Sequence, residues 1–110
     1  MPLQPAAFHI LLALASKNRH GYDIMKQTLI DSDGTVKLGP GTLYGNIKKM
    51  LTAGLITEID ERPEPALDDS RRRYYSLTPL GASSLNAEMT RMSNLVSLGR
   101  KKGAFNSKAV

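Results

Sequence analysis

The hydrophobic period of the sequence changes at Gly54, and this change constrains the fold more than any other feature. Before it, residues 5–53 contain three segments typical of helices. After it, residues 55–61 and 72–78 alternate in polarity with the period of half-buried strands. Thr78–Pro79 then starts a last helix, with threonine as N-cap and proline at the first helical position. The chain is therefore predicted to be mainly α with a small β-hairpin, an α+β fold.

The first two helical segments have different apolar patterns. Residues 5–16 are apolar on nearly all sides, which predicts a central helix packed on every face. In residues 21–31, Tyr22, Met25 and Leu29 are spaced as one face of a helix, with Ile24 alongside. We expect this face to be the buried one.

A third helix is predicted over about residues 40–53, and Gly54 supplies its stop. Its buried stripe has helical spacing and consists of Leu43, Ile47, Met50 and Leu51. The opposite face is small, polar and cationic, and consists of Gly41, Gly45, Lys48, Lys49 and Thr52. Such a face suits the major groove of DNA, because it offers side chains for base edges and phosphates and no carboxylate. The alternative is an ordinary solvated face.

Residues 62–70 separate the two predicted strands and contain two prolines, which cannot take part in a strand ladder. We therefore expect a hairpin with a long loop over about residues 62–72. Arg71 and Arg72 stand at the base of this loop and are expected to contact phosphate. The alternative is that arginines of this run form ion pairs with acidic side chains of the opposite strand and the loop.

Apolar side chains recur along the last helix with coiled-coil spacing, which predicts that it pairs with a second copy of the chain. The predicted interface consists of Leu85, Met89, Met92, Leu95 and Val96. A chain of 110 residues leaves much apolar surface exposed, so self-association is expected. The expected units are a DNA-binding domain over 1–77, a dimerisation helix over 78–102 and a disordered basic tail over 103–110.

The predicted elements follow one another in the order of a winged helix-turn-helix domain, whose third helix enters the major groove of DNA. Asn46 is suited to pair with adenine, and Lys48 and Lys49 to contact guanine or phosphate. His20, just before the second helix, is expected to cap that helix in preference to contacting DNA or sensing pH.

Three stretches of the sequence resemble the PadR family of bacterial and archaeal transcriptional regulators. They are HGYDI at 20–24, GTLY at 41–44 with AGLI at 53–56, and RRYYSLTPLG at 72–81. The resemblance implies a cytoplasmic homodimer that binds a palindromic site on double-stranded DNA. It also implies repression that a small apolar or phenolic effector relieves.

The resemblance assigns roles to further residues. It implies that Thr42 and Tyr44 face DNA at the start of the third helix and that Tyr22 lies close to phosphates. The alternatives are that Tyr44 is a ring at the edge of the core and that Tyr22 is packed with its hydroxyl outward. Gly45 follows GTLY where many members have proline, so the conformation of this turn stays open.

Composition bears on other classes of function. The sequence has no cysteine, and its two histidines cannot form a metal site alone. No nucleophile, base and orienting group can be assembled, so we expect neither an enzyme nor a cofactor. The apolar run over 8–15 is too short to span a bilayer.

Charge alone is a weak argument for DNA binding. The net charge is +5, but residues 39–77 contain as many acidic as basic side chains. The acidic loop motivates an alternative function, a winged-helix module that binds another protein without specific DNA binding. The predicted effector pocket is lined by Phe8, Met89 and Met92, because methionine side chains can adapt to a small bound molecule. The alternative is that these methionines only pack.

Overall fold

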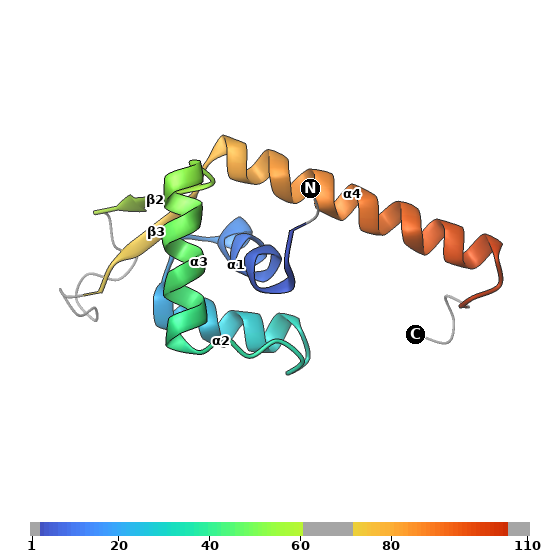
Figure 1. Ribbon diagram of the computed structural model, residues 1–110, viewed down its shortest axis with the longest axis horizontal. Coiled ribbons are helices and arrows are strands. Elements are labelled where there is room, and N and C mark those ends of the chain that lie inside the picture. The colour runs from blue at the N-terminus through green and yellow to red at the C-terminus, as the bar shows by residue number, and fades with distance from the viewer. Residues whose placement is uncertain (1–2, 61–71, 106–110) are drawn as a thin grey trace.

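The computed structural model describes residues 3–60 and 72–105 and confirms the predicted mainly α fold with a small sheet (Figure 1). The elements are α1 Pro5–Ser16, β1 Arg19–His20, α2 Gly21–Asp31, α3 Pro40–Ala53, β2 Ile56–Ile59, β3 Tyr74–Leu77 and α4 Pro79–Lys101. Figure 1 shows α1 surrounded by the other helices, while the C-terminal half of α4 extends beyond the rest of the chain. None of the helices in the described residues is long and apolar enough to cross a bilayer.

The central helix, α1, has the predicted bounds and begins with proline. Its buried side chains point in several directions and are Phe8, Ile10, Leu11, Ala13 and Leu14. Side chains of α2, α3, β3 and α4 pack around them in one hydrophobic core. The absence of a polar face on this segment therefore reflects its central position.

The sheet has three strands in the order β1-β3-β2, whereas the sequence predicted a two-stranded hairpin. β1 pairs antiparallel with β3, with Arg19 opposite Tyr75 and His20 opposite Tyr74. A strand of two residues is too short to show alternation in the sequence. Both tyrosines are buried, because β3 is the central strand and the His20 ring meets the Tyr74 ring edge-on at 5.3 Å.

The buried face of α2 differs from the predicted one. Gly21, Ile24 and Thr28 are buried, whereas Tyr22 is 57% exposed and Leu29 is 42% exposed. Gly21 is covered by Tyr44 of α3, since a Cβ atom at Gly21 would lie 2.5 Å from the Tyr44 hydroxyl oxygen. Of the four residues predicted on the apolar face, Ile24 is buried and Met25 is partly buried, so the prediction is wrong for Tyr22 and Leu29.

The start of α4 is fastened to the turn that follows α3. The Thr78 hydroxyl accepts a hydrogen bond from the Gly81 amide (3.0 Å) and donates one to the Gly54 carbonyl (2.6 Å), which confirms Thr78 as the N-cap. The Thr78 amide donates to the Leu55 carbonyl (3.1 Å). A Cβ atom at Gly81 would lie 2.0 Å from that carbonyl oxygen, so a side chain there would separate α4 from the turn.

The two halves of α4 have different environments. Leu85 is 7% exposed and belongs to the core of the chain itself, so its assignment to the dimer interface is wrong. Met92 packs partly against the same core. Other apolar side chains of α4 are exposed, namely Met89 on the outer face and, further along the helix, Leu95, Val96 and Leu98. After Lys101, Gly103 adopts a left-handed conformation and the Phe105 ring lies 5.2 Å from the Arg100 guanidinium.

Glu88 joins α4 to the residue that precedes α1. It is 5% exposed, and its carboxylate accepts hydrogen bonds from Arg91 Nε (2.6 Å) and from the Leu3 amide. These two hydrogen bonds, the one from Arg91 first, hold the pKa of the Glu88 carboxyl below its ordinary value. The carboxylate therefore stabilises the folded chain in its charged form.

Glu88→Gln is expected to remove part of the acid sensitivity of the fold. A carboxyl whose pKa is lower in the folded chain stabilises it above the ordinary value of 4.5, and this stabilisation is lost as the pH falls toward the folded value. Urea unfolding across the acid range should therefore show a steeper loss of stability below pH 4.5 in the wild type than in the variant. Parallel pH profiles would contradict this role.

Candidate nucleic-acid interface

The third helix has the predicted bounds and, except for Leu51, the predicted buried stripe. α3 begins with Pro40 after the N-cap Gly39 and ends before Gly54, whose φ of 78° is left-handed. Leu43, Ile47 and Met50 are buried, whereas Leu51 is 37% exposed. This anchoring holds α3 by one face and leaves the opposite face to solvent.

The outer face of α3 is open. Its exposed residues include Thr42, Gly45, Lys48 and Lys49. A Cβ atom at Gly41 or Gly45 would meet no neighbouring atom within 4 Å. Packing among the described residues therefore gives no reason for glycine at these two positions.

Asn46 is half-buried on the flank of this face. Its side-chain amide donates a hydrogen bond to the Thr42 carbonyl one turn earlier (2.8 Å). Bidentate pairing with adenine uses one amide N–H and the amide oxygen. If the side chain rotated to make that pair, the hydrogen bond to Thr42 would be released.

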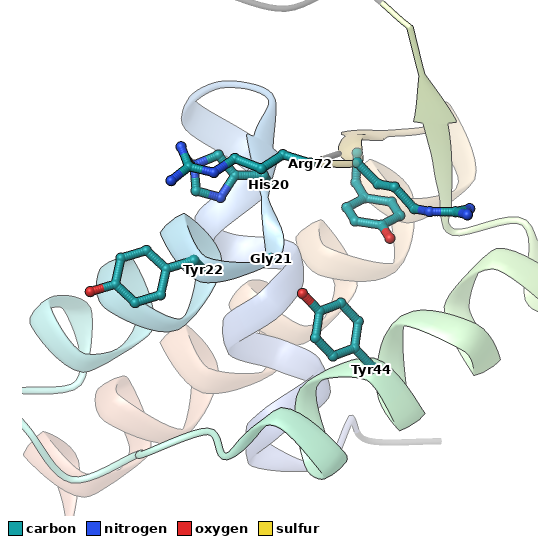
Figure 2. Close-up of a pocket in the computed structure, with 7 residues that line it drawn as sticks. His20, Gly21, Tyr22, Tyr44 and Arg72 are labelled. Carbon is teal, nitrogen blue, oxygen red and sulfur yellow. Dashed lines mark hydrogen bonds between the residues drawn. The ribbon is translucent and has the colours of Figure 1, made fainter. Parts of the chain in front are cut away.

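A surface cavity of about 510 Å³ lies where the starts of α2, α3 and β3 meet. Figure 2 shows its lining, which consists of His20, Gly21, Tyr22, Tyr44, Arg72, Arg73 and Tyr75. Tyr44 is 51% exposed, and its hydroxyl lies against Gly21, where a Cβ atom would be 2.5 Å away. The glycine at the start of α2 thus gives Tyr44 its place at the rim.

His20 has the predicted capping role and a second one. Its Nδ1 accepts a hydrogen bond from the Asp23 amide (3.2 Å), which confirms the prediction that it caps α2. In a neutral ring the proton then resides on Nε2, which makes Nε2–H a donor. Arg72 Nη1 lies 3.4 Å from Nε2, so two donors stand side by side at the cavity. This arrangement favours an anionic oxygen that accepts from both.

Tyr22 lies on the opposite rim. Its ring is exposed rather than packed, and it stacks on the His20 ring with centroids 6.5 Å apart. The Lys26 ammonium lies 5.5 Å from the ring centroid of Tyr22. The hydroxyl points away from the core in Figure 2 and is accessible to a partner.

The run of arginines is divided between two roles. Arg73 pairs with Glu58 on β2 (3.3 Å), which confirms the ion-pair alternative for this arginine. Arg72 lies beside His20, and Arg71 lies outside the described residues.

Burial, and next the nearby Glu58 carboxylate, raise the pKa of the Tyr75 hydroxyl in the cavity wall. That hydroxyl therefore stays protonated and can donate.

Arg19 is a buried cation that the sequence pattern does not reveal. Its guanidinium donates to the Ala13 carbonyl (2.8 Å), to Ser16 Oγ (3.0 Å) and to Asp23 (3.0 Å). It is 6% exposed, so its role is to join the end of α1 to α2. Asp23 four residues later is the one sequence signal for this pair.

The residues predicted to line an effector pocket have different environments in the single chain. Phe8 is buried in the core, Met92 is partly buried, and Met89 is on the exposed face of α4. None of these three side chains lines the cavity at His20 and Tyr44 or the cavity at Met25 and Lys37.

Comparison with known proteins gives a family and several relatives. A profile of the transcriptional regulator PadR-like family matches residues 10–87. An uncharacterized 37.1 kDa protein in a transposon of Streptomyces fradiae is 32% identical over 95 residues, which are 86% of this chain and 25% of that protein. The chain therefore spans about a quarter of the length of this curated relative.

Solved structures share the fold. A PadR family transcription regulator from Clostridium difficile has a TM-score of 0.73 at 24% identity, over 89% of this chain and 97% of the other. A transcriptional regulator from Clostridium thermocellum has a TM-score of 0.69 at 23% identity, over 87% of each chain. Bacillus subtilis PadR in complex with operator DNA has a TM-score of 0.65 at 21% identity, over 78% of this chain and 47% of the other. These similarities confirm the predicted winged helix-turn-helix fold.

Proposed function

The chain belongs to the transcriptional regulator PadR-like family, and on that premise we propose that it is a dimeric repressor that binds a palindromic site on double-stranded DNA. Membership of this family confirms the prediction of a regulator rather than an enzyme. In the proposal, residues 1–77 bind DNA, residues 78–102 hold the dimer together and residues 103–110 form a basic tail. α3 would enter the major groove, and the loop over 62–72, of which 62–71 lie outside the described residues, would lie on flanking backbone.

The open outer face of α3 carries this proposal. Glycine inside a helix costs roughly 0.5–1 kcal/mol relative to alanine. Gly45 has no neighbour that requires it within the described part of the chain, so a partner outside the chain supplies the reason. DNA is such a partner, because Lys48 and Lys49 flank the same face and suit base edges and phosphates.

The cavity beside α3 is proposed to contact the DNA backbone. A phosphate oxygen there would accept hydrogen bonds from Arg72 and from Nε2–H of His20, with the hydroxyls of Tyr22 and Tyr44 at the rim. The N-terminus of α2 adds its positive dipole to the same place. The structure of Bacillus subtilis PadR with operator DNA supports a DNA partner for this fold.

The exposed apolar face of α4 is proposed to pair with a second copy. Leu95 is 53% exposed and Val96 is 40% exposed, on a part of the helix that extends beyond the rest of the chain (Figure 1). Burying such a face is favourable, and pairing would place one α3 on each side of a two-fold axis. The proposed effector would bind at this seam, where Met89 and Met92 can adapt to it.

Selection of genomic fragments bound by the full chain tests the function. The proposal expects recovered fragments to share a palindrome whose half-site centres lie about 34 Å apart, one helical turn of DNA. Fragments without a shared sequence would contradict specific recognition. Recovery of a stable protein partner, with no DNA retarded, would support the interaction module instead.

Gly45→Ala is expected to change stability and DNA binding in opposite directions. Alanine should raise the free energy of unfolding by roughly 0.5–1 kcal/mol, because the added methyl group meets no neighbour and favours the helix. The same methyl group should weaken DNA binding by about 1–3 kcal/mol, because it stands between α3 and the groove. Thermal unfolding and fluorescence anisotropy with labelled DNA check the two effects. A more stable variant with unchanged affinity would remove Gly45 from the interface.

Arg72→Ala is expected to weaken binding to all duplexes alike. Loss of one phosphate contact should lower the slope of log affinity against log salt by about 1. Arg73→Ala is the matched control, because that guanidinium already pairs with Glu58. Equal losses of salt dependence in the two variants would contradict the assignment of Arg72 to phosphate.

A further inference from the structure

A separate cavity, of about 240 Å³, lies between α2 and the segment that leads into α3. It is lined by Met25, Lys26, Leu29, Lys37 and Leu38. Leu38 is 9% exposed and Met25 is partly buried, so the floor of the cavity is apolar and belongs to the folded core. The lining contains no carboxylate and no aromatic ring.

Two lysines line this cavity from two different segments. Lys26 comes from α2 and Lys37 from the connector, and neither forms an ion pair with another residue in the described ranges. Lys26 lies over the Tyr22 ring, 5.5 Å from its centroid. An inorganic anion would leave the floor uncovered, and a neutral hydrocarbon would leave both charges without a partner.

We propose that this cavity binds a short aliphatic carboxylate. Its alkyl chain would cover the floor, where Met25 and Leu29 are flexible enough to adapt to it. Its carboxylate would pair with the ammonium groups of Lys26 and Lys37. The chain is aliphatic because no ring in the lining offers a stacking surface.

Occupation of the cavity is coupled to α3. Leu38 directly precedes Gly39, the N-cap of α3, and the connector is held to the end of α2 through a hydrogen bond from the Val36 amide to Ser32 Oγ (3.0 Å). A bound carboxylate adds a negative charge beside the start of α3 and draws Lys26 from Tyr22. DNA affinity should therefore fall by about fivefold when the cavity is filled. This coupling rests on the proposed function, whereas the binding site does not.

Binding is tested on the full chain without DNA, by NMR titration of backbone amides with hexanoate. A ligand of this size is expected to bind in the millimolar range, with shifts concentrated around Met25, Leu29 and Lys37. Acetate carries the charge without the chain, and 1-hexanol carries the chain without the charge. Each should bind at least about fivefold more weakly than hexanoate. Scattered shifts, or equal binding of hexanol and hexanoate, would overturn the site.

Substitutions locate the charge contacts. The double variant Lys26→Gln/Lys37→Gln should bind hexanoate about fivefold more weakly, because two exposed ion pairs are lost. Lys48→Gln is the matched control, since it removes an exposed lysine on α3 that does not line the cavity. Unchanged binding by the double variant would overturn the proposal. Folding of each variant is read from the dispersion of the same spectra.

Titration of labelled operator DNA with and without hexanoate then tests the coupling. A fivefold loss of affinity in the wild type, absent from the double variant, supports it. Localised hexanoate binding with no change in DNA affinity overturns the coupling alone. Absence of specific DNA binding under all conditions overturns the proposed function and leaves the hexanoate site standing.

Discussion

Gly81→Ala is expected to lower the free energy of unfolding by about 3 kcal/mol, the largest effect predicted for a single methyl group in this chain. The added Cβ atom would lie 2.0 Å from the Leu55 carbonyl oxygen and 2.8 Å from Leu77 Cδ1. The backbone must move to relieve the first contact, because that oxygen belongs to the turn between α3 and β2. The same oxygen accepts the Thr78 amide, so the movement also strains the start of α4.

Gly99→Ala is the matched control for this prediction. It makes the same substitution in the same helix, but its Cβ atom would meet Phe105 at an ordinary 3.6 Å. Alanine there should be neutral or stabilising by roughly 0.5–1 kcal/mol, because it favours the helix. Urea unfolding of both variants measures the difference. Equal stabilities would contradict the close packing of α4 on the turn.

Leu95→Asp is expected to convert the proposed dimer into a monomer and to lower affinity for the proposed palindromic site by about 10²–10⁴-fold. A carboxylate in the centre of a helix seam loses hydration without gaining a partner. A monomer binds one half-site only. It loses the high effective concentration at which the second subunit of a dimer meets the second half-site. Leu95 is 53% exposed in the single chain, so the variant should still fold.

Ser97→Asp is the control, because it introduces the same charge on the same exposed stretch of α4. Helical spacing turns Ser97 away from the face that carries Leu95 and Val96. Analytical ultracentrifugation should show a dimer for this control and a monomer for Leu95→Asp. A monomeric wild type, or a Leu95→Asp variant that is dimeric and binds DNA normally, would exclude α4 as the dimer interface.

Strong local signals made α1, α3 and α4 predictable from the sequence. Proline begins each of them, and Gly54 and Thr78 mark the end of α3 and the start of α4. β1 was not predictable, because its two residues gain their extended form by pairing with β3. The exposure of Tyr22 and Leu29 on α2 was not predictable from helical spacing, because Gly21 is covered by Tyr44 of α3, a contact between two elements.

The candidate site was predictable where it depends on one helix and not where it depends on contacts between elements. Lys48, Lys49 and Gly45 lie on the face that helical spacing assigned to them. The approach of Arg72 to His20 joins residues far apart in the sequence, and no local pattern contains it. The net charge of +5 was a poor guide for the same reason, since the placement of single cations decides the chemistry.

The most direct test of the central claim compares the affinity of the wild-type chain for a selected palindromic duplex and for a scrambled duplex of equal length at physiological salt. If α3 reads bases in the major groove, the selected duplex should bind at least about 10³-fold more tightly. Asn46→Ala should narrow that ratio by roughly 1–3 kcal/mol. Equal affinity of the wild type for the two duplexes would contradict the claim that this chain is a sequence-specific DNA-binding regulator.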